Sequence, residues 1–171
     1  MNFSVHCFDI PFVKLTKGYR KVDETTFWKN VDHKVPGIKN AKGAYIFALR
    51  RSKGYMPFYV GKTNKSFGQE VLQSHKWRHY MNCINDEFGT PIILFIAART
   101  TKTGKFSTND NDTLFQWLET YLINLALTRN NNLLNTSKTR FIKEISIPDL
   151  LNSPKGASTK ESRILKQMLG F

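Results

Sequence analysis

Two short β-rich runs separated by a charged turn constrain the fold of this chain more than any other feature. The first run is Gly43–Leu49 (GAYIFAL) and the second is Pro57–Thr63 (PFYVGKT), with a charged, glycine-containing turn at residues 50–54 between them. Two runs of this length joined by such a loop are typical of an antiparallel hairpin. We therefore expect a β-hairpin over residues 43–63.

The residues after this hairpin alternate between helical and strand-like patterns. Residues 67–80 place apolar side chains among polar ones, which predicts an amphipathic helix that begins after Ser66. Ile92–Ala98 is a short run rich in branched residues, which predicts a buried strand. Residues 112–128 predict a longer helix, and Lys160–Leu169 predicts a terminal one.

The longer helix has a candidate cap and a candidate buried side. Asp110 or Asp112 is placed to cap its first turn. Its expected buried stripe consists of Leu114, Leu118, Tyr121, Leu122 and Leu125. The order strand, strand, helix, strand, helix predicts an α+β fold: a small three-stranded antiparallel sheet flanked by helices, with amino- and carboxy-terminal extensions.

The charge of the chain indicates the class of its partner. Its 171 residues include 26 Lys and Arg against 13 Asp and Glu, so the formal net charge is +13. The excess is +3 over residues 1–40, +6 over 41–101 and +4 over 102–171, which is not the pattern of a basic tail on a neutral domain. A basic protein of this kind favours a polyanionic partner, and nucleic acid is the commonest one inside cells.

Other sequence features exclude several classes of protein. The longest apolar run has seven residues, far short of the roughly 20 that span a bilayer, so no membrane insertion is expected. The first residues do not resemble a secretory signal, and we expect a cytoplasmic protein. Cys7 and Cys83 lie far apart without a CxxC partner, which argues against a disulfide framework and a structural zinc site.

The hairpin also carries two matching triplets, Gly43-Ala44-Tyr45 on the first strand and Tyr59-Val60-Gly61 on the second. Glu119 follows on the longer helix, and Leu133-Leu134-Asn135 comes after that helix. In this order the residues resemble the GIY-YIG nuclease family, whose signature triplets lie on adjacent strands of a small sheet. The resemblance covers about residues 41–137 as a catalytic domain. Residues 1–40 are then an amino-terminal extension packed on it, and 138–171 are a carboxy-terminal accessory segment.

This resemblance implies a Mg²⁺-dependent endonuclease that hydrolyses phosphodiester bonds, with DNA favoured over RNA as the substrate. Tyr45 would be the general base for the attacking water, and Lys62 beside it would lower its pKa. Tyr59 would hold the phosphate or the water. Glu119 would be the only protein ligand of one Mg²⁺ or Mn²⁺ ion, in contrast to two-metal nucleases, which need several acidic residues close together.

The chain departs from the family at the first helix, where the family places an Arg. Residues 64–72 contain no Arg, and they include Glu70. The nearest replacements are His75 and Arg78, which we predict as the phosphate-facing catalytic pair. Glu70 is either a second acidic group in the site or a residue that faces away and pairs with a Lys. Contacts to nucleic acid are predicted for Gly61, Lys76, His79 and Asn135.

Two other functions stay open at this point. A noncatalytic nucleic-acid-binding protein of the same fold would explain the missing Arg. A protein-interaction domain, in which the positive charge serves solubility, would make the triplets a coincidence and ranks last. Taken singly, a strand Tyr such as Tyr45 is more often a packing residue than a catalytic one. A symmetric homodimer is an alternative to a monomer, because small nucleases that cut both strands often dimerise.

Overall fold

The computed structural model describes residues 1–14, 20–73, 76, 80–81, 88–101, 103–109, 111–135, 139–140, 144–150 and 152–170. The chain divides into two compact units, Met1–Asn135 and Thr136–Phe171. The second unit contains α6 (Lys160–Met168), which confirms the predicted terminal helix; a capping box begins it. In the part of the chain that the structure describes, no helix is both long and apolar enough to cross a membrane.

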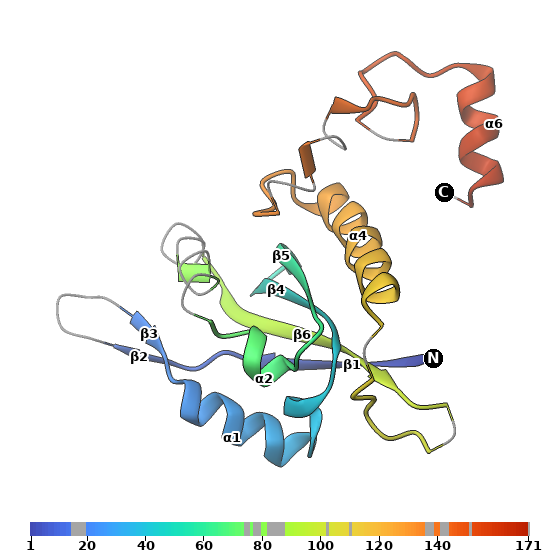
Figure 1. The fold of residues 1–171 in the computed structure, drawn as a ribbon. Coiled ribbons are helices and arrows are strands. Elements are labelled where there is room, and N and C mark those ends of the chain that lie inside the picture. Colours follow the sequence, from blue (N-terminus) through green and yellow to red (C-terminus); the bar gives the residue numbers. More distant parts are fainter. Residues whose placement is uncertain are drawn as a thin grey trace. The chain divides into compact units, whose positions relative to one another are not determined.

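A four-stranded antiparallel sheet forms the centre of the first unit (Figure 1). The strand order is β1-β6-β4-β5, with β1 at Asn2–Asp9, β4 at Gly43–Arg51, β5 at Gly54–Thr63 and β6 at Thr90–Arg99. The predicted hairpin is confirmed as β4 and β5, and the predicted third strand is confirmed as β6, which pairs with β4. The mixed α and β composition is confirmed as well.

The prediction of three strands was wrong, because β1 adds a fourth. β1 pairs with β6 along its whole length, from Asn2 opposite Arg99 to Asp9 opposite Ile92. Within β1, only Phe8 is buried, and the side chain of Val5 is 62% exposed. A strand with so little apolar alternation carries a weak sequence signal, and pairing with β6 is what makes it a strand.

The residues between β1 and β4 form a small hairpin and a helix. β2 (Phe12–Lys14) pairs with β3 (Arg20–Val22), and α1 (Glu24–Lys34) and the short helix η2 (Ile38–Asn40) follow. Asp23 caps α1, since its carboxylate accepts hydrogen bonds from the Thr26 backbone N–H at 3.0 Å and the Thr26 hydroxyl at 2.6 Å. These elements position a large aromatic core against one side of the sheet.

That side, the aromatic face, is defined by Tyr45, Phe47, Leu49, Ile93 and Phe95, all of them fully buried. They share one side because side chains alternate along a strand. Trp28 from α1 stacks on Phe95 with ring centroids 6.1 Å apart, and Phe67 stacks on Phe95 at 4.4 Å. The aromatic face is therefore covered by α1 and by the segment that follows β5.

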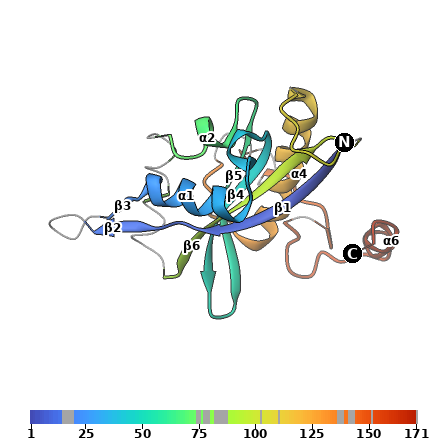
Figure 2. The ribbon, with the colours of Figure 1, turned by 90° about the horizontal axis from the view of Figure 1, so that it is seen from below.

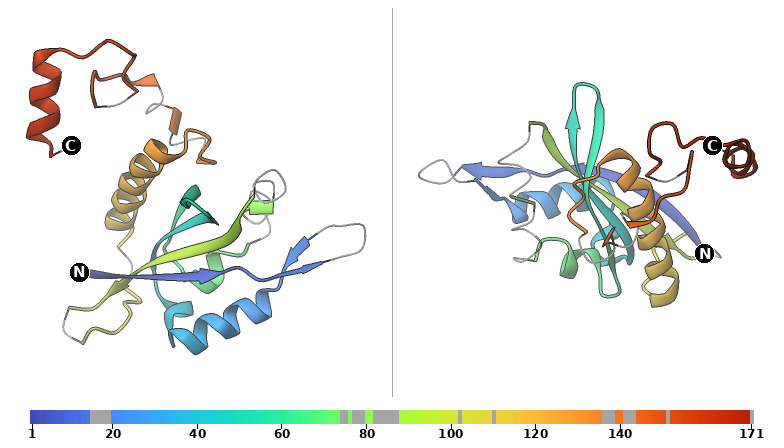
Figure 3. Two further views of the ribbon diagram at one scale, coloured as in Figure 1. Left: turned by 180° about the vertical axis from the view of Figure 1, so that it is seen from behind. Right: turned by 90° about the horizontal axis from the view of Figure 1, so that it is seen from above.

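The opposite side, the aliphatic face, is defined by Ala44, Ala48 and Val60 and is covered by α4 (Asp112–Arg129). Figures 2 and 3 show α1 and α4 on opposite sides of the sheet. The predicted helix is confirmed, and its cap is Asn111 rather than either predicted Asp. The buried side chains of α4 are Phe115, Glu119, Ile123, Ala126 and Leu127.

The predicted buried stripe of α4 was therefore wrong. Tyr121 and Leu125 are exposed, and Leu114, Leu118 and Leu122 are only partly buried. α4 carries apolar residues around most of its circumference, so the 3.6-residue period alone does not decide which side faces the sheet.

The first predicted helix is confirmed at its start and is interrupted after Glu70; of the described residues beyond the interruption, Lys76 and Tyr80 are helical again. α2 runs over Phe67–Glu70, with Ser66 as its cap as predicted, and a turn follows at residues 71–72. The side-chain amide of Gln73 donates to the carbonyl of Gln69 at 2.7 Å, the acceptor that a further helical turn would use.

Candidate active site

The two triplets meet on the aromatic face through the register of the hairpin. Tyr45 lies directly opposite Gly61, and Phe47 lies directly opposite Tyr59. Opposed residues of an antiparallel pair point to the same side, so both signature tyrosines project from one face. A Cβ added to Gly61 would lie 2.5 Å from the Tyr45 hydroxyl oxygen and closer still to the ring. Gly61 is thus the residue that makes room for the Tyr45 ring.

A β-bulge at Phe58 shapes the second strand. The register shifts between Phe47 and Ala48, which face Tyr59 and Pro57, so Phe58 is an extra residue in β5. Phe58 packs into the aromatic core, and Tyr59, beside it, is partly buried. The bulge is a feature that sequence patterns did not predict.

Three tyrosines form the polar end of the aromatic face. The ring centroids of Tyr45 and Tyr59 are 6.1 Å apart, and Tyr80 lies 6.1 Å from Tyr59 while stacking on Phe47 at 4.3 Å. Tyr45 and Tyr80 are fully buried, whereas Tyr59 is partly exposed. Tyr59 is therefore the member of the signature pair that solvent reaches.

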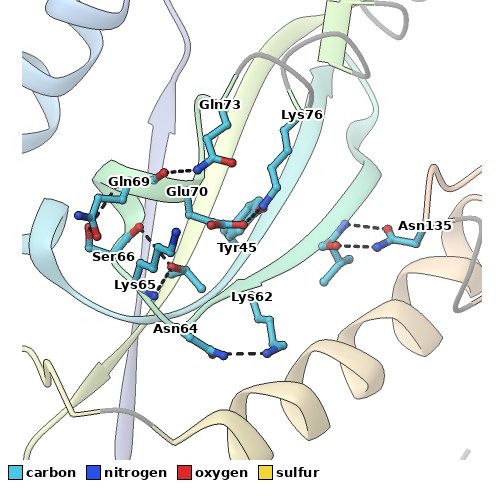
Figure 4. Close-up of polar contacts among 12 residues, drawn as sticks. Tyr45, Lys62, Asn64, Lys65, Ser66, Gln69, Glu70, Gln73, Lys76 and Asn135 are labelled. Atoms are coloured by element: carbon cyan, nitrogen blue, oxygen red, sulfur yellow. Dashed lines mark hydrogen bonds and ion pairs between the residues drawn. The ribbon is translucent and has the colours of Figure 1, made fainter.

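A lysine and a glutamate close over these rings (Figure 4). Lys76 Nζ donates a hydrogen bond of 2.8 Å to the Tyr45 hydroxyl oxygen and forms an ion pair with Glu70. The Lys76 ammonium also lies 5.4 Å from the centroid of the Tyr45 ring. The two alternatives for Glu70 are thereby resolved in part: it pairs with a Lys, and it does so at the tyrosines instead of facing away.

The environment disfavours ionisation of the tyrosines. Burial raises the pKa of Tyr45 far above its usual value, and the neighbouring Tyr80, Tyr59 and Glu70 raise it further. Burial raises the pKa of Tyr59 most, and repulsion from the Glu119 carboxylate raises it further. The hydrogen bond with Tyr45 lowers the pKa of Tyr59. A base role at this pair consequently requires a positive charge that stabilises the phenolate.

Glu119 lies on the inward side of α4, and its side chain is nearly buried. Its charge raises the pKa of Tyr59, so the Glu119 carboxylate lies within electrostatic range of that hydroxyl. Among the described residues, no three His, Cys, Asp or Glu side chains gather into a metal-binding group. A single carboxylate oxygen donor is compatible with Mg²⁺, which keeps most of its waters.

Lys62 lies on the other side of the sheet from Tyr45. Its register partner is Ala44, on the aliphatic face. Its ammonium pairs with Asp112 at the start of α4 and lies 3.4 Å from the Asn64 side-chain oxygen (Figure 4). The structure thus does not bring Lys62 to the Tyr45 hydroxyl, where the sequence interpretation placed it.

Asn135 is buried against the backbone of β5. Its side chain accepts from the Val60 N–H at 2.9 Å and donates to the Val60 carbonyl at 2.6 Å, as a neighbouring strand would. The Leu134 N–H donates to the Phe58 carbonyl at 2.8 Å, and the Asn130 amide donates to the Pro57 carbonyl at 2.7 Å. The motif that ends in Asn135 therefore covers the open edge of the sheet.

Three predicted residues, His75, Arg78 and His79, lie outside the residues that the structure describes. Sequence reasoning missed Tyr80 and did not identify Lys76 as the lysine that pairs with Glu70. The available signal was the pair of opposite charges Glu70 and Lys76, six residues apart. A helix brings residues three or four apart onto one face, so the predicted helix did not suggest this pair.

Comparison of the chain with protein-family models, with curated proteins and with solved structures finds no match.

Proposed function

We propose that this chain is a Mg²⁺-dependent endonuclease of the GIY-YIG type that hydrolyses phosphodiester bonds of DNA. The observation that carries the proposal is the register of the hairpin, which sets Tyr45 and Tyr59 side by side with Gly61 beneath the Tyr45 ring. The β5-β4-β6 order, followed by α4 with Glu119, supports a GIY-YIG-like fold. The net charge of +13 supports a nucleic-acid substrate.

In this mechanism the tyrosine pair accepts the proton of the attacking water. Tyr59, which solvent reaches, orients the water, and Tyr45 lies behind it. Glu119 would hold Mg²⁺, which when bound supplies positive charge to the scissile phosphate. The net charge of +13 attracts the phosphate backbone and makes the affinity sensitive to salt.

A noncatalytic nucleic-acid-binding protein is the second candidate, and one observation favours it. Tyr45 is fully buried with a raised pKa, so in the free protein it keeps its proton. A site of this kind binds nucleic acid without cutting unless a cation offsets the burial.

The test is incubation of the purified protein with supercoiled plasmid DNA, in Mg²⁺ or Mn²⁺ and in EDTA. We expect nicking that depends on the metal and is lost in Glu119→Gln. The matched control is Glu24→Gln, an exposed acidic residue in the first turn of α1, which keeps wild-type nicking. Tyr45→Phe should lower the cleavage rate by about 10²–10⁴-fold. Salt-sensitive DNA binding without cleavage in either metal would favour the binding protein.

A further inference from the structure

The tyrosine site needs a cation, and among the described residues two lysines are candidates for that role. Lys62 follows the second triplet directly, whereas Lys76 lies in the segment after α2. Both form an ion pair with a carboxylate, so pairing alone does not distinguish them. The positions of the two ammonium groups relative to Tyr45 distinguish them.

The ammonium of Lys62 is held on the aliphatic face by Asp112 at the start of α4, with Asn64 nearby. The ammonium of Lys76 donates directly to the Tyr45 hydroxyl oxygen, and its side chain is only 12% exposed. Electrostatic attraction weakens with distance and with exposure to water, so the buried lysine in contact has the larger effect on Tyr45.

We propose that Lys76 is the positioning residue that supplies positive charge to Tyr45, and that Glu70 holds the Lys76 ammonium in place. The inference rests on the proposed nuclease function and deepens it. Lys76 then takes a role at the tyrosines for which the sequence suggested Lys62, in a chain that has no Arg over residues 64–72.

The charged and titratable groups that face Tyr45 come from each neighbouring element. Among the residues that the structure describes, they are Tyr59 on β5, Glu70 on α2, and Lys76 and Tyr80 in the segment beyond α2. Burial, the two tyrosines and Glu70 all oppose the phenolate, and Lys76 is the cation in contact with it. Lys76 and Glu70 therefore shift the pKa of the Tyr45 hydroxyl in opposite directions.

Lys76 keeps its proton throughout the reaction step. The ionised Tyr45–Tyr59 pair takes one proton from water while the water oxygen forms a bond to phosphorus. The bond between phosphorus and the 3′ oxygen breaks, and the departing 3′ oxygen takes a proton from solvent. Lys76 lowers the cost of the ionised pair before the step begins.

The test is the plasmid cleavage rate as a function of pH for Lys76→Met and Glu70→Gln. Removing the cation raises the Tyr45 pKa, so the rising part of the Lys76→Met profile moves to higher pH and the rate at a fixed pH falls by about tenfold or more. Glu70→Gln removes the negative charge but keeps a side-chain oxygen that accepts from Lys76, so the Tyr45 pKa falls and the profile moves to lower pH. Lys76→Arg restores most of the rate.

Lys39→Met is the matched control, since the Lys39 ammonium also lies 5.4 Å from a ring centroid, that of Trp28. It removes the same charge and leaves the pH profile in place. The inference is overturned if Lys76→Met leaves the profile unchanged, or if Lys62→Met moves it and Lys76→Met does not.

Failure of the nuclease proposal gives a different result. A wild-type protein that cleaves no DNA at any pH overturns the proposed function. The pairing of Lys76 with Tyr45 is then tested by the melting temperatures of Lys76→Met, Tyr45→Phe and the double variant. Less than additive shifts support the pairing, and additive shifts overturn it.

Discussion

The two faces of the sheet are built from different residues and serve different purposes. The aliphatic face presents Ala44 and Ala48 to α4, and small side chains let a helix pack closely. The aromatic face presents stacked rings, and its polar end carries Lys76 and Glu70. The difference teaches that the sheet separates two lysines: Lys62 pairs with Asp112 of α4 on the aliphatic face, and Lys76 contacts Tyr45 on the aromatic face.

The largest expected effect comes from removing a buried ring from the aromatic face. Phe47 is fully buried and stacks on Tyr80 at 4.3 Å. Phe47→Ala should lower the free energy of unfolding by about 3–5 kcal/mol, because it removes the ring and leaves a cavity. Urea denaturation measures this, with Phe88→Ala, at a 94% exposed position, as the control. Equal effects of the two variants would contradict the assignment of the core.

A smaller loss is expected where Asn135 covers the edge of β5. Asn135→Ala leaves the Val60 N–H and carbonyl without their side-chain partner, and we expect a total loss of about 1–3 kcal/mol. Asn131→Ala, at an exposed position in the turn that precedes Asn135, should stay within about 0.5 kcal/mol of wild type. Denaturant unfolding of both variants tests whether Asn135 supports the fold, and an unchanged Asn135→Ala would remove that role.

The close approach of Gly61 to Tyr45 predicts the next effect. Gly61→Ala should cost about 1–3 kcal/mol of unfolding free energy, since the new methyl group meets a ring packed on all sides. At Gly68, an added Cβ meets mainly the flexible Lys39 side chain, and the position is helical. Gly68→Ala should therefore cost less than Gly61→Ala in a thermal melt, and the reverse order would contradict this packing.

The smallest effect is expected at the ion pair of the aliphatic face. Lys62→Met breaks the contact with Asp112, whose side chain is 57% exposed. Such partly exposed pairs are worth about 0–1 kcal/mol, so the melting temperature should hardly move and should depend little on salt. A large loss of stability would show that Lys62 has a role beyond joining β5 to α4.

Several features were predictable because they depend on local pattern. The hairpin, β6, α4 and the Ser66 cap follow from apolar runs, turn residues and capping preferences. β1 was missed because its alternation is weak, and the buried side of α4 was misassigned because that helix is apolar nearly all round. The end of α2 depends on Gln73, whose side chain replaces a helical hydrogen bond.

The sequence by itself determined the β-strands of the hairpin, β6 and α4, because hydrophobic periodicity and turn chemistry act over a few residues. The bulge at Phe58 sets Tyr45 opposite Gly61 instead of Val60, and the sequence pattern did not predict it. Only the tertiary structure decided which charged groups meet. Lys76 rather than Lys62 reaches Tyr45, and Asn135 reaches β5 from 75 positions along the chain. Contacts of that kind depend on which face each side chain leaves and on how helices pack, and neighbouring residues do not encode them.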